Sequence, residues 1–393
     1  HRVAHWNPTS PMNQYQRIHF LDFSRSVAIL MMLQGHFISM TLASYPTFMA
    51  EVRLHGSSGS IWFSIWGFFR GLTAPLFFTI SGAVFTYLLH KEWQKGTAAF
   101  FKLVRVKKGL RRGLSLILVG YLLQMNLKFL KYYISGHFNP HFLGFHILQC
   151  IGIGLLSLLL MTSLIYKIRQ HSWILYLLFA LVIFGFTPLV RLQPDYFPEG
   201  IPVILQNMIQ GPDTGFSIFP WIGFVFFGAG FGHYLSLHGT GFKNKNVYRY
   251  LIGVGLTYYF VGWIMTFIYN GDFTHFHYKY LWAFDRSFFV AILLMLFTYI
   301  SGFERFRPSI FMAVGQETFA IYVLHAVILY GAITGYSLRT FLENKLSALE
   351  AIFGAILFLG FFIGLVQVLE PIRQFFRNFR TFFIPNGRTN KPQ

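Results

Sequence analysis

The chain has 393 residues, of which 54% are hydrophobic and only 11% are charged. A soluble domain carries about a quarter charged residues, so this composition excludes a soluble protein and indicates an integral membrane protein. The net charge of +19 comes from Lys and Arg clusters between apolar runs, which is typical of membrane loops and argues against nucleic-acid binding. The single Cys150 excludes an intramolecular disulfide framework, and we expect no metal site.

Ten apolar runs are long enough to cross about 30 Å of hydrocarbon. The connections between them are short, which predicts an all-α polytopic membrane protein folded as a single bundle of about ten transmembrane helices. We expect an N-terminal tail over residues 1–16, whose first eleven residues do not resemble a natural start, a membrane domain over 17–370 and a basic cytoplasmic tail over 371–393. The ten predicted spans are Ile18–Ala43, Ile61–Leu89, Gly113–Leu130, Phe142–Ile165, Trp173–Val190, Phe216–Leu237, Val247–Tyr269, Phe284–Ile300, Thr318–Gly335 and Ala348–Leu369.

The distribution of Lys and Arg orients these spans. With a cytoplasmic N-terminus, the inner segments hold 22 of these residues and the outer segments hold 8. This bias predicts that both termini are cytoplasmic. The compact loops and the lack of an evident signal peptide favour a bacterial cytoplasmic (inner) membrane. In the tail, Arg373, Arg377 and Arg380 recur at helical spacing among Phe residues, which indicates an interfacial helix on anionic lipid.

The first predicted span carries three polar residues of interest, Asp22, Arg25 and His36. At 100° per residue they fall within a sector of about 60°, although Asp22 and His36 are about 21 Å apart along the axis. Charges within a span are costly, so this polar stripe is expected to line a cavity. The alternatives are a headgroup anchor for Asp22 and Arg25, and a satisfied hydrogen bond for His36.

Cations also occur at two other places in the chain, one inside a predicted span and one in a cytoplasmic segment. Arg70 sits in an apolar run of the second span, where it requires an anion, carbonyl groups or a neighbouring helix. The segment KLVRVKKGLRRG is richer in cations than orientation alone requires, which indicates a phosphate-bearing cytoplasmic ligand. Its six cations are Lys102, Arg105, Lys107, Lys108, Arg111 and Arg112.

The spacing of Asp22, Arg25 and His36 resembles the opening motif of the acyltransferase-three family and of the related heparan-α-glucosaminide N-acetyltransferase-like family. Together these form one transmembrane acyltransferase superfamily. Four later segments are similar to recurrent segments of the second family and occur in the same order, so the resemblance extends from about residue 17 to 370. They are RGLTAPLFFTISG (70–82), HILQCIGIG (146–154), FPWIGFVFFGAGFG (219–232) and GQETFAIYVLHAVIL (315–329).

The resemblance implies a membrane acyltransferase, and most simply an acetyltransferase. Such an enzyme moves an acyl group from cytoplasmic acetyl-CoA or another acyl-CoA to a saccharide or lipid-linked acceptor on the outer side. By the same resemblance, His36 takes the position of the catalytic His of the acyltransferase-three family. Arg25 takes the position of the residue that lies on the acyl-CoA side of the site. The heparan enzyme has Asn at the matching place and its catalytic His farther along the first outer loop. His55 is the only His of that loop here, and it is the reserve candidate.

Acyl transfer requires a base for the acceptor and donors for the developing oxyanion. We expect His36 to remove a proton from an amine or hydroxyl, with either Asp285 at the outer start of the eighth span or a backbone carbonyl as its orienting group. The expected acyl-CoA-binding residues are Asp22, Arg25, Arg70, Arg105, Lys108, Arg111 and Arg112. The expected acceptor or oxyanion residues are His146, Gln149, Trp221 and His325.

Other interpretations of the same residues stay open. Trp221 also fits an aromatic-belt residue, and His325 also fits a helix-packing hydrogen bond. The polar stripe also fits a transporter or flippase of a small polar or lipid-linked substrate, or a non-catalytic membrane subunit of a larger complex. Direct transfer and an acyl-histidine intermediate are both compatible with the sequence, as are a monomer and a homodimer.

Overall fold

The computed structural model describes residues 19–55, 58–95, 99–129, 134–135, 140–165, 172–192, 200–211, 213–239, 244–271, 276–303 and 309–383. This part of the chain is helical apart from isolated β-bridges. The predicted N-terminal tail lies outside the described residues. So does the predicted C-terminal tail beyond Phe383, where the last helix ends.

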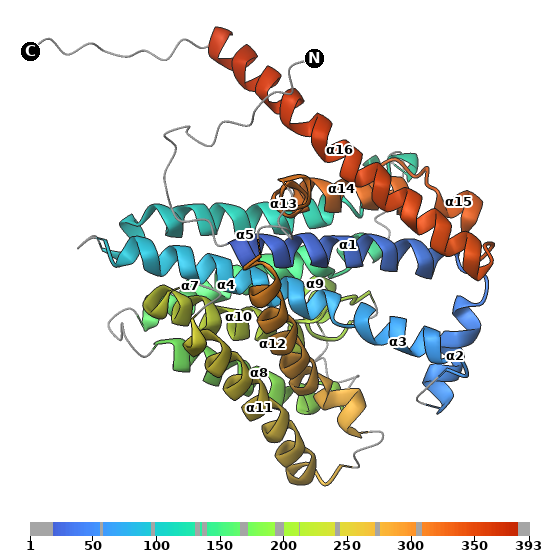
Figure 1. Cartoon of the computed structure of the whole chain (residues 1–393). Helices are drawn as coiled ribbons and strands as arrows, with labels where there is room; N and C mark the ends of the chain where they lie inside the picture. Colours follow the sequence, from blue (N-terminus) through green and yellow to red (C-terminus); the bar gives the residue numbers. More distant parts are fainter. Residues whose placement is uncertain are drawn as a thin grey trace, which may run out of the picture.

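The helices follow one another with short connections (Figure 1). The first half contains α1 (His19–Thr41), α2 (Tyr45–His55), α3 (Ile61–Arg70), α4 (Thr73–Trp93), η1 (Phe100–Lys102), α5 (Val104–Leu122), η2 (Leu127–Phe129), η3 (Pro140–Leu143) and α7 (Ile147–Leu164). The second half contains α8 (Ser172–Arg191), α9 (Val203–Ile209), α10 (Ile218–His238), α11 (Lys245–Ile268), the π-helix η4 (His277–Leu281), α12 (Trp282–Ile300), α13 (Ser309–Gln316), α14 (Thr318–Tyr330), α15 (Arg339–Leu342) and α16 (Ala348–Phe383).

Each of the ten predicted spans overlaps a helix, but fewer helices meet the length and composition of a membrane span. Among the described residues, seven helical stretches do so, or eight if the bent pair of α13 and α14 forms one span. Neither α1, with its polar stripe, nor α5, with its cations, is among them. The structure therefore supports an all-α polytopic membrane protein with seven or eight spans. The count of ten and the cytoplasmic position of the termini stay predictions.

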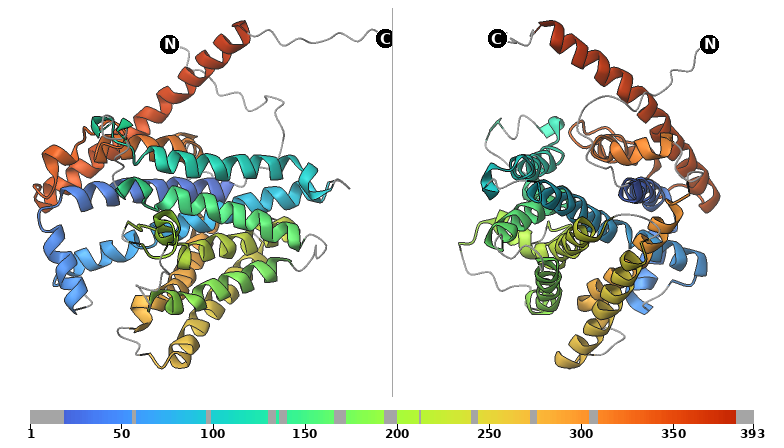
Figure 2. Two further views of the ribbon diagram at one scale, coloured as in Figure 1. Left: turned by 180° about the vertical axis from the view of Figure 1, so that it is seen from behind. Right: turned by 60° about the vertical axis from the view of Figure 1, so that its left-hand side comes forward.

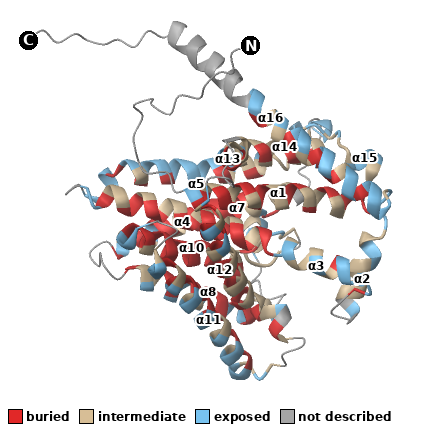
Figure 3. Cartoon of the chain, in the orientation of Figure 1, coloured by how far each residue is buried: buried red, intermediate tan, exposed pale blue. Residues whose placement is uncertain are grey.

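Helix α1 runs through the middle of the molecule, with α4 and α5 on one flank and α13, α14 and α16 on another (Figures 1 and 2). Buried residues concentrate on α1, α4, α7 and α10, whereas α16 is largely exposed along one face and extends away from the bundle (Figure 3). The larger apolar core is built around α4, α7, α8, α10 and α12. A smaller one joins α1 to α13, α14 and α16. Because α1 contributes to both, its polar residues lie between two packed halves.

The interface of α4 with α10 depends on glycine. A Cβ atom built at Gly82 would collide with the carbonyl of Val225, and one at Gly228 would collide with the carbonyl of Thr79. Membrane helices lack a hydrophobic driving force toward one another in lipid, so close backbone approach is a main source of their association. The FFGAGFG sequence of α10 therefore sets how near α4 lies to the rest of the core.

Two breaks in the helices lie beside α1. Between α3 and α4 the chain turns at Gly71, where Arg286 Nη1 of α12 donates to the Phe68 carbonyl at 2.9 Å and stabilises the end of α3. Between α13 and α14 the axis bends by 78° around Glu317. Non-helical backbone at membrane depth is found where it is buried in protein or lines a polar space. The bend at Glu317 therefore marks a candidate polar region, whereas Gly71 and Leu72 keep helical backbone angles between α3 and α4.

The glycine contact gives a direct test of the packing. We expect Gly228→Val to push α10 from α4 and to lower the unfolding temperature of the detergent-solubilised protein by about 2 °C or more, as about 2 kcal/mol of overpacking implies for a chain of this length. Gly253→Val on α11 is the matched control, because nothing lies within 4 Å of a Cβ built there. Equal unfolding temperatures for the two variants would contradict the packing described here.

Candidate active site

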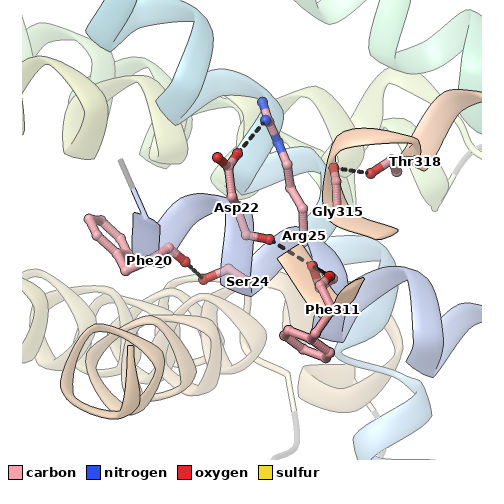
Figure 4. Close-up of polar contacts among 8 residues, drawn as sticks. Phe20, Asp22, Ser24, Arg25, Phe311, Gly315 and Thr318 are labelled. Carbon is pink, nitrogen blue, oxygen red and sulfur yellow. Dashed lines mark hydrogen bonds and ion pairs between the residues drawn. The ribbon is translucent and has the colours of Figure 1, made fainter. Parts of the chain in front are cut away.

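The N-terminal half of α1 carries an ion pair and is joined to α13. Arg25 Nη1 donates to Asp22 Oδ1 at 3.1 Å, one turn along the helix. Ser26 Oγ donates to the Phe311 carbonyl oxygen of α13 at 2.6 Å. Figure 4 shows this turn of α1 against α13, where the absence of a side chain at Gly315 permits the close approach. The ion pair is thus held at a defined place in the bundle.

A pocket opens beside Arg25, between α1, α4 and α5. Arg105, Lys108 and Arg112 of α5 line it together with Arg25, and its lining includes no carboxylate side chain. Arg25 and Arg112 are near enough to repel each other electrostatically. Such a group of cations attracts an anion. Arg111 is exposed on α5 and does not line this pocket, whose other lining residues are Ser81, Val84, Phe85, Leu88, Gly109 and Leu155.

Glu92 of α4 holds the start of α5 in place. Its carboxylate accepts hydrogen bonds from the backbone N–H groups of Val104 at 2.9 Å and Arg105 at 2.7 Å. The first N–H groups of a helix have no partner within the helix, and an anion satisfies them well. The sequence analysis missed this contact, although an acidic residue shortly before a basic helix was an available signal. Glu92 thereby positions the cations of α5 beside α4.

The C-terminal half of α1 meets α14 at a cluster of polar rings. His36 Nδ1 lies 2.6 Å from the Tyr330 hydroxyl. The His36 and His325 rings are in edge contact, with centroids 5.3 Å apart, and Tyr322 packs on His325 at 5.0 Å. His325 is 2% exposed, and its Nδ1 has no hydrogen-bond partner among the described residues. Of the four predicted acceptor or oxyanion residues, His325 is the one that the structure brings to His36.

The Tyr330 contact determines what the His36 ring can do. When Nδ1 carries the proton and donates to the Tyr330 oxygen, Nε2 is an acceptor able to take up a proton. Nε2 of His36 has no hydrogen-bond partner in the part of the chain that the structure describes. Tyr330 therefore orients the ring in the way that a base-orienting group does. The sequence analysis did not single out Tyr330, which stands at the end of α14, five residues after His325.

Arg70 lies at the His36 end of α1, not in the pocket beside Arg25. Its side chain crosses Gly35, where a built Cβ would be 3.3 Å from Arg70 Cγ. The guanidinium carbon is 5.8 Å from the ring centre of Tyr45 and interacts electrostatically with His36. Arg70 of α3 therefore lies beside the half of α1 that carries His36, whereas Arg25 lies in the other half. Its predicted contact with acyl-CoA stays a prediction, away from the pocket at Arg25.

Asp285 orients a histidine, but a different one from the predicted partner. Its Oδ2 lies 2.9 Å from Nε2 of His277, whose Nδ1 lies 2.7 Å from Thr266 Oγ1. His36 is held by Tyr330 instead. The expectation that Asp285 orients His36 is therefore corrected. The π-helical turn η4, which precedes α12, brings His277 to Asp285.

The remaining predicted residues lie away from the His36 cluster. His146 is the N-cap of α7 and packs against Gly215, while Gln149 is fully buried against α5 with neither amide atom paired among the described residues. Trp221 stacks within an aromatic group, 5.4 Å from Phe78 and 5.2 Å from Trp282. His55 ends α2, and its side chain lies outside the described part of the chain.

The sequence analysis also missed a buried pair of histidines. The His90 and His233 rings stack at 3.8 Å, and Tyr176, itself hydrogen-bonded to Thr162 at 2.8 Å, lies 3.3 Å from His90 Nε2. The two histidines are far apart in the sequence, so only the packing of α4 on α10 reveals the pair. The described residues contain no group of three or more His, Cys, Asp or Glu placed to hold a metal ion.

A polytopic helical bundle with a cationic pocket at one end of a central helix and a histidine–tyrosine cluster near the other is typical of a membrane enzyme that transfers a group between two substrates. Over residues 17–270 the chain matches the family described as heparan-alpha-glucosaminide N-acetyltransferase, catalytic. The match spans more than half of the chain, and the chain belongs to this family. It is therefore a membrane acetyltransferase, and the family uses acetyl-CoA. A comparison with curated proteins finds no match.

The family match confirms the resemblance predicted from the motifs. It includes α1 and α5, and so both the cationic pocket and His36. It ends before His325 and Tyr330, the residues of α14 that contact the His36 ring. The predicted role of His325 and the contact of Tyr330 with His36 thus lie outside the family match and depend on the sequence motif and the structure.

Tyr330 provides a test of the His36 geometry. We expect Tyr330→Phe to lower kcat for acetyl transfer by about tenfold, because Nδ1 loses a hydrogen bond of about 1 kcal/mol and the imidazole is no longer held in one tautomer. The rate is measured at saturating acetyl-CoA. Tyr336→Phe is the control, since that ring is 75% exposed and its contact is with Lys128. An unchanged kcat in Tyr330→Phe would refute the orienting role.

Proposed function

We propose that the protein transfers the acetyl group of cytoplasmic acetyl-CoA to an amine or hydroxyl of a saccharide-type acceptor on the outer side of the membrane, with His36 as general base. The observation that carries this proposal is the pair of polar sites on α1. The cationic pocket surrounds Arg25, and the His36 ring is held by Tyr330 eleven residues farther along the same helix.

The separation of the two sites suits acetyl-CoA. Eleven residues of helix correspond to a rise of about 16 Å. The pantetheine arm has twelve single bonds between its phosphate ester oxygen and its sulfur, which span about 14 Å at the length per bond of an extended chain. With the phosphates at the cations of α1 and α5, the thioester carbonyl comes within reach of His36. The charged part of CoA then stays at the water interface.

The chemistry follows from the groups around His36. Nε2 takes the proton of the acceptor N–H or O–H as that atom bonds to the acetyl carbon. The carbonyl oxygen becomes negative, and we assign Arg70 and His325, both close to the His36 ring, as the groups that stabilise this charge. Collapse of the intermediate breaks the carbon–sulfur bond, and the proton on His36 passes to the thiolate. The products are the acetylated acceptor and CoA.

His36 carries the first test of this proposal. We expect His36→Gln to reduce the rate of transfer from labelled acetyl-CoA by about 10²- to 10⁴-fold while acetyl-CoA binding persists, because the variant loses the base and retains the cations. His19→Gln, an exposed residue at the start of α1, is the control. A full rate in His36→Gln would exclude the base. Transport of a sugar that is independent of CoA would favour a transporter instead.

Lys108 carries the second test, which concerns the phosphates. We expect Lys108→Gln to raise KM for acetyl-CoA by about tenfold, because a charge-assisted contact to phosphate is lost. KM for S-acetylpantetheine, which has no phosphate, should not change. Lys245→Gln, an exposed Lys at the start of α11, is the matched control. Equal effects on both acyl donors would contradict phosphate binding in this pocket.

A further inference from the structure

A second and larger pocket lies at the C-terminal end of α1. Its volume is about 410 Å³, within the range of small-molecule binding sites. It is bounded by α1, by α2 and by the turn that follows α15. Its lining residues are Ser39, Met40, Tyr45, Pro46, Met49, Ala50, Glu343 and Asn344.

This pocket adjoins the His36 cluster. Ser39 lies one helical turn after His36, and its hydroxyl donates to the His36 carbonyl at 3.2 Å. Tyr45 places its ring beneath Arg70, whose side chain passes over Gly35 next to His36. The pocket and the His36 cluster therefore share the Ser39 turn of α1 and the Tyr45–Arg70 contact. A molecule in the pocket is held beside the proposed base.

The lining combines a ring, apolar side chains and unused polar atoms. Tyr45, Met40 and Met49 supply apolar surface against which one face of a sugar ring can pack. Glu343 Oε1 accepts two hydrogen bonds from Arg339, at 2.8 and 2.5 Å, and Oε2 has no partner in the described residues. These hydrogen bonds lower the pKa of the Glu343 carboxyl, so it is ionised near neutral pH.

The turn that presents Glu343 is anchored to α1. The Asn344 N–H donates to the Met40 carbonyl at 3.0 Å, and the Leu346 N–H donates to the Thr41 carbonyl at 2.9 Å. Asn344 also adopts a φ of +52°, a conformation that Asn tolerates better than most residues. The carboxylate is thus held in a defined position, as a residue that selects a ligand has to be.

We propose that this pocket is the acceptor subsite and that Glu343 is the residue that positions the acceptor, its free Oε2 accepting a hydrogen bond from a hydroxyl or ammonium group of the sugar. The inference depends on the proposed function, because it takes His36 as the base toward which the acceptor is turned. The acceptor ring packs on Tyr45, and Arg339 holds the opposite oxygen of the carboxylate. The pocket contributes residues beyond the region of the family match.

The test compares three variants with glucosamine and, in parallel, glucose as acceptors. Glu343→Gln retains the shape of the side chain and removes the charge, so we expect the acceptor KM to rise by about tenfold while KM for acetyl-CoA and kcat stay within about twofold. Arg339→Gln removes the ion pair that holds the carboxylate in place, so we expect a smaller rise of the acceptor KM, of about threefold. Glu350→Gln, at the start of α16 outside the pocket, controls for the loss of a carboxylate.

The variants distinguish an acceptor subsite from a pocket with no role in acceptor binding. An unchanged acceptor KM in Glu343→Gln, or an equal rise in Glu350→Gln, overturns the subsite. Ala50→Trp should fill the pocket, abolish transfer to sugar and leave acetyl-CoA binding intact; normal transfer in that variant overturns it as well. If the wild-type protein transfers acetyl to neither sugar but binds glucosamine, and Glu343→Gln loses that binding, the pocket is supported and the proposed function fails.

Discussion

The need to satisfy charged and polar groups within an apolar bundle governs this structure. Helix α1 carries Asp22, Arg25 and His36 through the centre of the molecule, where each unpaired group would cost several kcal/mol. The fold meets this cost locally through the Asp22–Arg25 ion pair, and for His36 through the Tyr330 hydroxyl of α14. The cations of α5 add positive charge beside Arg25, which makes this pocket suited to an anion.

Interruptions in the helices bring the other functional groups to α1. The turn between α3 and α4 follows Arg70 and lets its side chain cross Gly35. The 78° bend between α13 and α14 aims α14 so that His325 and Tyr330 contact His36. Without the bend, α14 would continue along the axis of α13, and His325 and Tyr330 would not turn toward His36. Broken helices thereby provide both the position and the unpaired hydrogen-bonding groups that a catalytic site uses.

The two pockets along α1 differ in charge. The pocket at Arg25 is cationic and suits phosphates, whereas the pocket at Ser39 presents a carboxylate, an amide and an aromatic ring. Under the proposed function, this difference directs the acyl donor to one end of α1 and the acceptor to the other. The polar atoms around His36 then lie between the two substrates.

The sequence by itself determined the membrane class and the positions of most helices, because apolar composition and helical periodicity are local properties. Its motifs also indicated the family. Only the tertiary structure decided the partners of these residues: His36 pairs with Tyr330 and not with Asp285, and Arg70 lies with His36 and not with Arg25. Those contacts join helices far apart in the chain and depend on glycine packing and on two helix breaks, whose angles no local pattern encodes.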